Sequence, residues 1–458
     1  YVVNNVLETF TSKVGQFVEV MNLEEFGNAL FIDHEIQVAE KDEKIYSSNF
    51  FKSSCDLSKK NNNVAIIGGG LAGVVALLEL SKAGAKVVLL EANQIGSGAS
   101  GRNGGFCSTG WASTNKNMNA ILGTGRANIL NQLGYDGFVW TRNKLLSPDY
   151  SSSMPIQGEL RLSLWNGSSE DISTHKISKE YLRKILTAKR YKTGFYNSNA
   201  FHFHPLNFIR TLTKEAIDAG GTVVENFRVK SVTKLRHTHI LETHSVPDKI
   251  YADKVIFATG GYGGKEFQFG MRHQLPIKTY IGVSEPMHEI LNKHITKNWA
   301  YSDTRRAGNY YRKLHDGSLL WGTSITAYGT LNTEKIKKMI LNDITSVFGE
   351  LGKEMTQSSL KIKYAWAGNM AYARHFLPYV KELQDGQYIL SGFGGHGMNT
   401  APIAAQLLSH AIISNSNAIQ PFKDIPNQRV YGKLGLVAAE LRYLTMQFLD
   451  FYKELKSK

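Results

Sequence analysis

The sequence has very little cysteine: its 458 residues include only Cys55 and Cys107. So few thiols exclude a small fold held by a disulfide framework, and they favour a reducing compartment, so we predict a cytoplasmic protein. Sets of His, Cys and carboxylate residues at metal-ligand spacing are also lacking, since His202 and His204 have no third partner nearby in the sequence. We therefore predict no metal.

A long hydrophobic run is missing as well. The most extended apolar stretch, residues 64–80, contains three consecutive glycines at residues 68–70. That pattern is typical of a strand, a turn and a helix in a globular core, so we predict no membrane span. No charged segment followed by an apolar core and a cleavage site lies near Tyr1, so a targeting peptide is either absent or already removed.

Acidic residues are comparatively scarce, because 39 Asp and Glu stand against 53 Lys and Arg, which gives a net charge of +14. Such an excess suits a nucleic acid or an anionic lipid as partner. The basic residues are scattered, however, without an arginine-rich run or a known nucleic-acid module. We interpret them as a solvated surface and expect no nucleic-acid partner.

Strand and helix patterns alternate through most of the chain, which predicts an α/β fold. A buried strand at residues 64–67, a helix at 71–83 and a strand at 86–91 form a βαβ unit, which opens a parallel sheet. Residues 277–283, 310–313 and 318–322 are typical of a separate antiparallel sheet. Another buried strand (387–391), a helix (401–413) and a closing amphipathic helix (434–455) follow. Short strand patterns before residue 53 predict β-hairpins, and residues 53–63 are polar like a linker.

The turn after the first strand has the form G-x-G-x-x-G, with Gly68, Gly70 and Gly73. The first glycine permits a tight turn, the second admits a pyrophosphate to the backbone, and the third lets the helix pack closely on the strand. Glu91 follows 23 residues after Gly68, where a carboxylate can accept hydrogen bonds from ribose hydroxyls and disfavours a 2′-phosphate. The unit therefore predicts dinucleotide binding.

Three further glycine-rich segments favour a flavin over a nicotinamide. Residues 95–105 (IGSGASGRNGG) form a small-residue loop that can approach a flat ring, and residues 252–262 end in the turn ATGGY. Residues 392–399 (GFGGHGMN) lead from a strand into a helix, whose N-terminus offers a dipole to the pyrimidine end of a flavin.

With these segments the chain resembles the FAD-dependent oxidoreductases of the D-amino-acid oxidase superfamily, and most of all their γ-glutamylputrescine oxidoreductase branch. The resemblance rests on residues 91–105, 202–212, 258–262, 309–322, 364–378 and 392–412. It implies non-covalent FAD, hydride removal from the carbon beside an amine, and return of the electrons to O2 or another acceptor. The resulting imine hydrolyses to an aldehyde or keto acid and an amine.

The resemblance also implies a Rossmann-like FAD-binding domain and an antiparallel-sheet substrate domain. We assign residues 61–114, 200–265 and 385–458 to the first and residues 115–199 and 266–384 to the second, with a β-hairpin domain at residues 1–52. The cofactor contacts it predicts are Gly68, Gly70, Leu71, Ala72, Gly73, Glu91, Ala92, Gly98, Ala99, Ser100, Arg102, Asn103, Gly104, Gly105, Val229, Thr259, Gly260, Gly395, His396, Gly397, Met398 and Asn399.

A second resemblance lies at residues 24–46, EEFGNALFIDHEIQVAEKDEKIY, which are similar to the N-terminal β-hairpin region of spermidine synthases. The methyltransferase-like domain of those enzymes does not follow, so aminopropyl transfer is not expected. The hairpins either pack and form a homo-oligomer, or they bring Gln37, Asp42 or Tyr46 to a polyamine. Both resemblances point towards polyamine chemistry.

Several side chains are candidates for catalysis and substrate binding. His396 is expected beside the flavin, as a contact or a proton-handling group. Tyr310, Tyr311 and Trp366 can form a pocket wall, because aromatic faces attract ammonium groups. Glu285 can pair with a distal ammonium. Asn309 stands where the polyamine branch often has Asp, which weakens the transfer of that branch's substrate preference.

Three functions remain open at this point. The first is oxidation of a polyamine or its γ-glutamyl derivative. The second is oxidation of a small N-methyl or D-amino acid, which needs an arginine for the carboxylate, with Arg312 or Arg374 as candidates. The third is a flavin-binding scaffold in polyamine metabolism without turnover.

Overall fold

The computed structural model describes residues 61–165, 174–243, 249–305 and 308–457, which belong to one compact unit of the chain. The predicted β-hairpin domain, with Gln37, Asp42 and Tyr46, lies outside the described residues. The predicted linker 53–63 overlaps the first strand, because β1 already begins at Asn61. In the described part no helix is long and apolar enough to cross a membrane.

The first sheet, which carries the nucleotide motif, has eight strands within the described residues, in the order β16-β17-β10-β1-β2-β7, with β9 paired to β10 and β8 paired to β9. Its centre is parallel and comprises β17 (Gln387–Ser391), β10 (Lys249–Phe257), β1 (Asn61–Ile67), β2 (Val87–Leu90) and β7 (Thr222–Val224). All four residues of β2 are buried, as expected for a parallel strand covered on both faces. The outer strands are β8 (Val229–Leu235), β9 (Thr238–Thr243) and β16 (Tyr379–Gln384).

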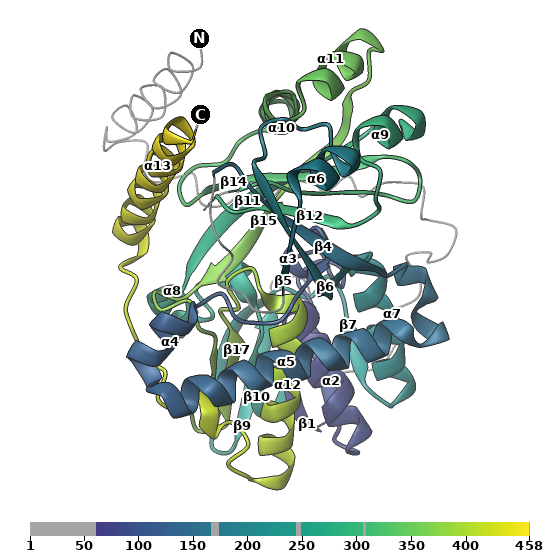
Figure 1. Ribbon diagram of the computed structural model, residues 1–458. Helices are drawn as coiled ribbons and strands as arrows, with labels where there is room; N and C mark the ends of the chain where they lie inside the picture. Colours follow the sequence, from purple (N-terminus) through teal and green to yellow (C-terminus); the bar gives the residue numbers. More distant parts are fainter. Residues whose placement is uncertain (1–60, 166–173, 244–248, 306–307, 458) are drawn as a thin grey trace. The chain divides into compact units, whose positions relative to one another are not determined.

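Helices pack in layers on this sheet. Helix α2 (Leu71–Lys82) is almost wholly buried and contacts α7 (Pro205–Asp218) and α12 (Gly397–Ser414). In Figure 1 the long helix α5 (Thr124–Leu146) runs across α12. The two helices come very close, because a Cβ at Gly137 would lie only 2.0 Å from the carbonyl oxygen of Asn399. Glycine at that position is therefore what allows α5 to pack there.

The second sheet has nine strands among the described residues and is almost entirely antiparallel, in the order β15-β11-β14-β13-β12-β4-β6-β3 with β5 beside β6. Its strands are β3 (Phe106–Cys107), β4 (Ile156–Ser163), β5 (Thr174–Ile177), β6 (Thr193–His202), β11 (Leu275–Ser284), β12 (Ala300–Asp303), β13 (Tyr310–Lys313), β14 (Leu319–Thr326) and β15 (Ile362–Tyr372). One face packs a hydrophobic core with α10 (Thr333–Val347) and α11 (Gly349–Gln357). Together, the two sheets confirm the predicted α/β fold with a separate antiparallel sheet.

The predicted domain boundaries need two corrections. Helices α4 (Asn115–Leu122) and α5 belong to the core of the first sheet, although residues 115–199 were assigned to the substrate domain. Conversely, the last helix, α13 (Gly432–Lys456), contacts β11 and β14 of the second sheet. In both cases the composition of the segment shows an amphipathic helix but not which sheet it will cover.

Candidate functional site

The turn between β1 and α2 is built so that only glycine fits. Gly68 has a φ of +112°, and a Cβ there would lie 2.6 Å from the carbonyl oxygen of Ala258. A Cβ at Gly73 would lie 2.1 Å from the carbonyl oxygen of Gly68. The backbone therefore turns tightly, and α2 begins after Gly70 at the carboxyl end of the sheet, as in a phosphate-binding turn.

Glu91 stands at the end of β2 and is held by backbone amides. Its Oε2 accepts a hydrogen bond from the Gly69 N–H at 2.7 Å, and its Oε1 accepts one from the Asn93 N–H at 2.9 Å. The hydroxyl of Ser97 lies 3.4 Å from Oε1. These contacts orient the carboxylate beside the glycine turn, which is where a ribose would need it.

A pocket opens at this edge of the sheet. Seven of the predicted cofactor residues line it: Gly68, Glu91, Ala92, Gly98, Arg102, Val229 and Thr259. The other lining residues were not predicted: Ile67, Leu90, Asn93, Ser97, Phe227, Arg228, Tyr262 and Glu266. The buried Thr259 Oγ1 has no hydrogen-bond partner in the described structure. A glycine cradle, an oriented carboxylate and an orphaned hydroxyl together fit the adenosine and pyrophosphate part of a dinucleotide.

The small-residue loop continues from this pocket as α3 (Ala99–Arg102). Ser100 Oγ accepts a hydrogen bond from the Leu71 N–H at 3.0 Å and so ties the loop to the start of α2. Asn103 donates to the carbonyls of Ala99 and Ser100 and accepts from the Gly105 N–H. Its amide therefore shapes the loop from within, which corrects the expectation that it faces the flavin.

Arg102 joins the loop to the second sheet. Its guanidinium donates to the carbonyl of Ala367 on β15 at 3.2 Å, and the indole N–H of Trp366 donates back to the Arg102 carbonyl at 2.9 Å. Burial lowers the pKa of Arg102. The predicted wall residue Trp366 thus lies directly against the loop that follows the nucleotide motif.

One cross-strand row of the second sheet points towards this loop. The pairing register aligns Arg161, Ser302, Tyr310, Gly322, Ile281 and Trp366, so their side-chain positions share one face. A Cβ at Gly322 would lie 2.0 Å from the Tyr310 ring, and one at Gly104 would lie 3.1 Å from it. The Tyr310 ring therefore lies over Gly322 and against Gly104. Its burial raises the pKa of Tyr310 to about 12.

Tyr311 does not reach this face. It is fully buried on the opposite side of the sheet, stacked between Tyr301 and Trp321 at centroid distances of 5.1 and 4.5 Å. Since neighbouring residues of a strand point to opposite faces, Tyr310 and Tyr311 cannot both line one pocket. The prediction for Tyr311 is therefore corrected: it is a core aromatic.

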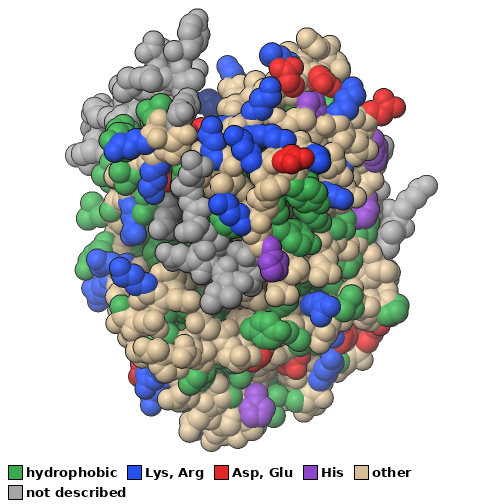
Figure 2. All heavy atoms as spheres, viewed as in Figure 1, with side chains coloured by type: hydrophobic (Ala, Val, Ile, Leu, Met, Phe, Trp, Pro, Cys, Tyr) green, Lys and Arg blue, Asp and Glu red, His purple; other side chains and the backbone are tan. Residues whose placement is uncertain are grey.

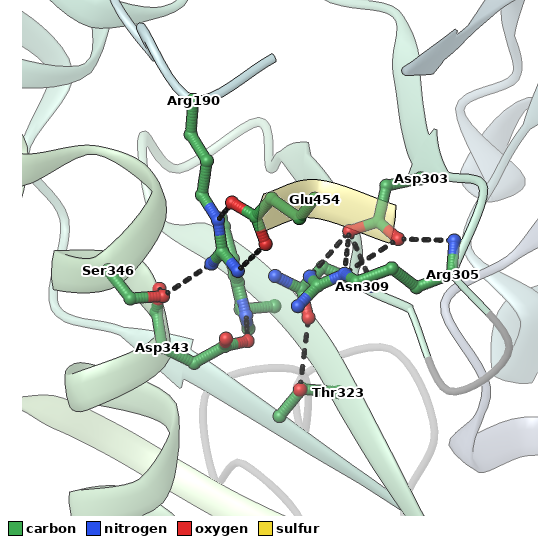
Figure 3. Close-up of polar contacts among 9 residues, drawn as sticks. Arg190, Asp303, Arg305, Asn309, Thr323, Asp343, Ser346 and Glu454 are labelled. Atoms are coloured by element: carbon green, nitrogen blue, oxygen red, sulfur yellow. Dashed lines mark hydrogen bonds and ion pairs between the residues drawn. The ribbon is translucent and has the colours of Figure 1, made fainter. Parts of the chain in front are cut away.

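The side chains of Glu285 and Asn309 also form contacts away from the face that carries Tyr310 and Trp366. Glu285 Oε2 accepts a hydrogen bond from the Lys361 N–H and closes the end of the β11–β15 pair. Figure 3 shows Asn309 directed towards Thr323, whose hydroxyl donates to Asn309 Oδ1 at 3.0 Å. Asn309 also lies beside the Asp303–Arg305 ion pair. Neither residue lies on the face that carries Tyr310 and Trp366. The presence of Asn309, where the polyamine branch often has Asp, therefore does not alter that face.

His396 lies in the turn before α12, where it meets the end of β15. A Cβ at Gly395 would lie 3.1 Å from the Met370 sulfur and 3.2 Å from the Tyr372 hydroxyl. The imidazole is solvent-accessible, yet the protein around it lowers its pKa to about 4 by desolvation, with a smaller effect from the charge of Arg161. His396 is therefore neutral at pH 7.

The following residues of that turn serve the fold. Met398 and Asn399 are buried, and the Asn399 amide donates to the carbonyls of Gly110 and Gly134 at 2.9 and 3.1 Å. These bonds attach the start of α12 to Gly134 of α5 and to the backbone at Gly110, so the predicted cofactor contact through the Asn399 side chain is corrected. The remaining predicted cofactor residues (Leu71, Ala72, Gly105, Gly260, Gly397) lie outside the residues that line the pocket.

Arg312 forms a contact that the sequence did not predict. Its guanidinium is buried and donates to the carbonyls of Gly104 and Phe203 at 2.7 and 3.0 Å, and it lies 3.3 Å from His202 Nδ1. Burial lowers the pKa of Arg312 to about 10 and, with the charge of Arg312, that of His202 to about 3. Arg312 therefore positions the Gly104 loop and is not free to bind a substrate carboxylate.

His204 and Cys107, which also lie in this region, are both used by the fold. His204 caps α7 by accepting a hydrogen bond from the Asn207 N–H at 3.2 Å. Cys107 is buried, and burial raises its pKa. In the part of the chain that the structure describes, no cluster of three or more His, Cys, Asp or Glu could hold a metal ion.

Comparison with known proteins gives matches over most of the chain. The family model described as "FAD dependent oxidoreductase" (DAO) matches residues 63–411. Gamma-glutamylputrescine oxidoreductase of Escherichia coli (strain K12) is 24% identical over 379 residues, which cover 80% of this chain and 87% of that protein. A polyamine aminopropyltransferase of Korarchaeum cryptofilum is 41% identical over 81 residues, 18% of this chain and 25% of that protein. The solved structure of glycine oxidase from Geobacillus kaustophilus superposes with a TM-score of 0.62 at 17% identity, covering 78% of this chain and 95% of that one.

Proposed function

The chain belongs to the DAO family of FAD-dependent oxidoreductases, and from this premise we propose that it oxidises a carbon–nitrogen bond of a polyamine or a γ-glutamyl polyamine. The observation that carries the proposal is the meeting of two aromatic side chains with the flavin-type loop. Tyr310 packs on Gly104, and Trp366 donates to the Arg102 carbonyl. An alkylammonium group that reaches the faces of these rings would be bound by cation–π attraction.

Binding of FAD by this chain fits the residues present. Gly68, Gly70 and Gly73 would admit the pyrophosphate at the start of α2, and Glu91 would hold the ribose. The loop of Ser100 and Arg102 would extend along the cofactor towards the second sheet. When bound, FAD supplies the hydride acceptor for oxidation of the amine.

The chain's own residues would orient the amine and manage its protonation. Hydride loss requires the neutral amine, and the apolar setting of Tyr310 and Trp366 favours it because desolvation disfavours an ammonium ion. The neutral His396, in the turn before α12, can accept a hydrogen bond or a proton. The imine then takes up water and yields an aldehyde and ammonia, or an amine where a secondary amine is oxidised, while O2 or another acceptor receives the two electrons.

The substrate class is supported by similarity rather than by a bound molecule. The E. coli relative is named for γ-glutamylputrescine, and the short match to a polyamine aminopropyltransferase points to the same chemistry. The amino-acid alternative loses one of its candidates, because Arg312 is engaged with Gly104, Phe203 and His202.

Anaerobic flavin reduction tests this proposal. The holoenzyme is mixed with putrescine, spermidine, γ-glutamylputrescine, sarcosine, glycine and D-alanine in turn, and the flavin absorbance is followed. We expect bleaching by a polyamine or its γ-glutamyl derivative, and recovery of colour in air identifies O2 as an acceptor. Bleaching by an amino acid alone would overturn the proposed substrate class. A yellow protein that no amine reduces would favour the scaffold alternative.

A further inference from the structure

Arg161 on β4 belongs to the same cross-strand row as Tyr310 and Trp366. It pairs with Ser302 of β12, and Ser302 in turn pairs with Tyr310 of β13. Residues paired across strands point to the same face, so Arg161 extends the aromatic wall by two strands. It lies close enough to His396 for its charge to act on that imidazole. Arg161 therefore lies on the same face of the second sheet as Tyr310 and Trp366, near the turn before α12.

The Arg161 guanidinium is exposed and, within the described residues, has neither an ion pair nor a hydrogen bond. This differs from Arg312 on the same sheet, whose donors are all directed at protein acceptors. Five N–H donors in a planar fork suit a carboxylate in two-point contact. An arginine left unpaired beside a reaction site is thus ready to bind an anion of the substrate.

Glu159, two residues before Arg161, faces the same way. Its Oε1 accepts a hydrogen bond from the Ser302 hydroxyl at 2.6 Å, which fixes the carboxylate on this face. Glu159 and Arg161 are not paired with each other in the described structure, although they share one face of one strand. The two side chains therefore offer a positive and a negative group side by side.

We propose that Arg161 is a specificity-determining residue that binds the carboxylate of the substrate, with Glu159 beside it for an α-ammonium group. The substrate class is then an amine that carries an amino-acid head, as a γ-glutamyl amine does. This inference rests on the proposed function and narrows it. A free polyamine would bring only positive charges to Arg161, and the surface adds no attraction, since the net charge is +14 and basic side chains are spread over the face in Figure 2.

A matched pair of substrates distinguishes the contribution of the amino-acid head group from that of the reacting amine. γ-Glutamylputrescine and N-acetylputrescine present the same terminal amine, but only the first has a carboxylate. We expect the holoenzyme to have at least tenfold higher kcat/KM for γ-glutamylputrescine, a difference of about 1.4 kcal/mol, since only this substrate can make a charge-assisted two-point contact with Arg161. Arg161→Met should remove that preference by raising KM for γ-glutamylputrescine.

Further variants and a binding measurement complete the test. Arg161→Lys should retain part of the preference, because lysine keeps the charge but not the fork. Arg142→Met removes an exposed arginine on α5 and should leave kcat/KM unchanged for both substrates. L-Glutamine carries the same amino-acid head, and calorimetry should show it binding at least tenfold more weakly to Arg161→Met than to the parent protein.

The outcomes distinguish the two proposals. Equal kcat/KM for the two putrescine derivatives, or an equal loss for both in Arg161→Met, would overturn the role of Arg161 while amine oxidation stands. If no amine bleaches the flavin, amine oxidation fails, and the glutamine calorimetry still decides whether Arg161 binds the head group. Equal affinity of the parent and Arg161→Met proteins for glutamine would show that Arg161 does not bind the head group.

Discussion

The carboxylate of Glu215 on α7 connects this helix to three neighbouring segments that pack with the first sheet. It accepts hydrogen bonds from Lys144 of α5 at 2.6 Å, from Lys82 of α2 at 2.8 Å and from the Tyr150 hydroxyl at 2.5 Å. Burial by itself would raise the pKa of Glu215, but these hydrogen bonds outweigh it and lower the pKa to about 2. We predict that Glu215→Gln destabilises the fold.

The size of the effect follows from the pKa. A change from 4.5 to about 2 corresponds to about 3 kcal/mol between the two protonation states. Solvent screens part of this, since the side chains of Lys82 and Glu215 are 46% and 29% exposed. We therefore expect Glu215→Gln to lower the free energy of unfolding by about 2 kcal/mol at pH 7.

The pH dependence has a defined sign. Because the pKa of Glu215 is lower in the folded state, the carboxylate stabilises the protein fully above about pH 5, and this contribution declines as the pH falls towards 2. By pH 3.5 about two fifths of it should be lost. Urea unfolding of the parent and Glu215→Gln proteins at pH 7, 5 and 3.5, with saturating FAD, measures the difference.

A control and a clear contradiction accompany this experiment. Glu180 pairs with Lys184 on an exposed helix face, with side chains 82% and 70% exposed, so Glu180→Gln should be nearly neutral. Equal stability of the parent and Glu215→Gln at pH 7, or a difference that is constant from pH 7 to 3.5, would refute the reasoning.

Three further predictions concern the candidate site. Gly73→Ala places a Cβ 2.1 Å from the Gly68 carbonyl, so we expect purified protein with less than about a tenth of the parent's FAD, measured by absorbance. Arg312→Met leaves the buried Gly104 carbonyl without its donor, which should cost about 1–3 kcal/mol in urea unfolding and loosen FAD. His396 has a pKa of about 4, so the rate of flavin reduction by the parent and by His396→Asn should depend on pH in the same way between pH 6 and 9. An inflection in the pH profile of the parent that is missing in the variant would contradict this.

The nucleotide motif could be predicted because its causes are local. Gly68, Gly70 and Gly73 lie within one turn, where Gly68 has a φ of +112° and a Cβ at Gly73 would lie 2.1 Å from the Gly68 carbonyl oxygen. Glu91 comes directly after the next strand, so its position beside the turn follows from the parallel pairing of β1 and β2. Such short-range geometry depends little on the rest of the fold.

The aromatic wall could be predicted only in part. The adjacent residues Tyr310 and Tyr311 were both candidates, and alternation along a strand requires that they point apart. Which one faces the flavin loop depends on the neighbours: Tyr311 stacks on Tyr301 and Trp321 in the core, while Gly322 leaves room for the Tyr310 ring. Those partners come from other strands and are not evident from residues 309–313 alone.

The roles of Arg312 and Arg161 were even harder to predict from the sequence. Arg312 was a candidate for substrate and is used inside the protein, while Arg161 was not considered and is unpaired within the described residues. A signal for Arg161 was present, since polar residues alternate with small or apolar ones along residues 157–162. Alternation, however, marks a face without saying what that face covers.

From the sequence by itself follow the α/β class, the dinucleotide turn and the flavin-type loop, because periodicity and glycine sterics act over a few residues. Only the tertiary structure decided that Tyr310, Trp366 and Arg161 share one face and that Arg312, Asn399 and Tyr311 serve the fold. The physical reason is that strand register and helix packing join segments from 10 to about 290 residues apart, and a side chain's role depends on which of them it meets.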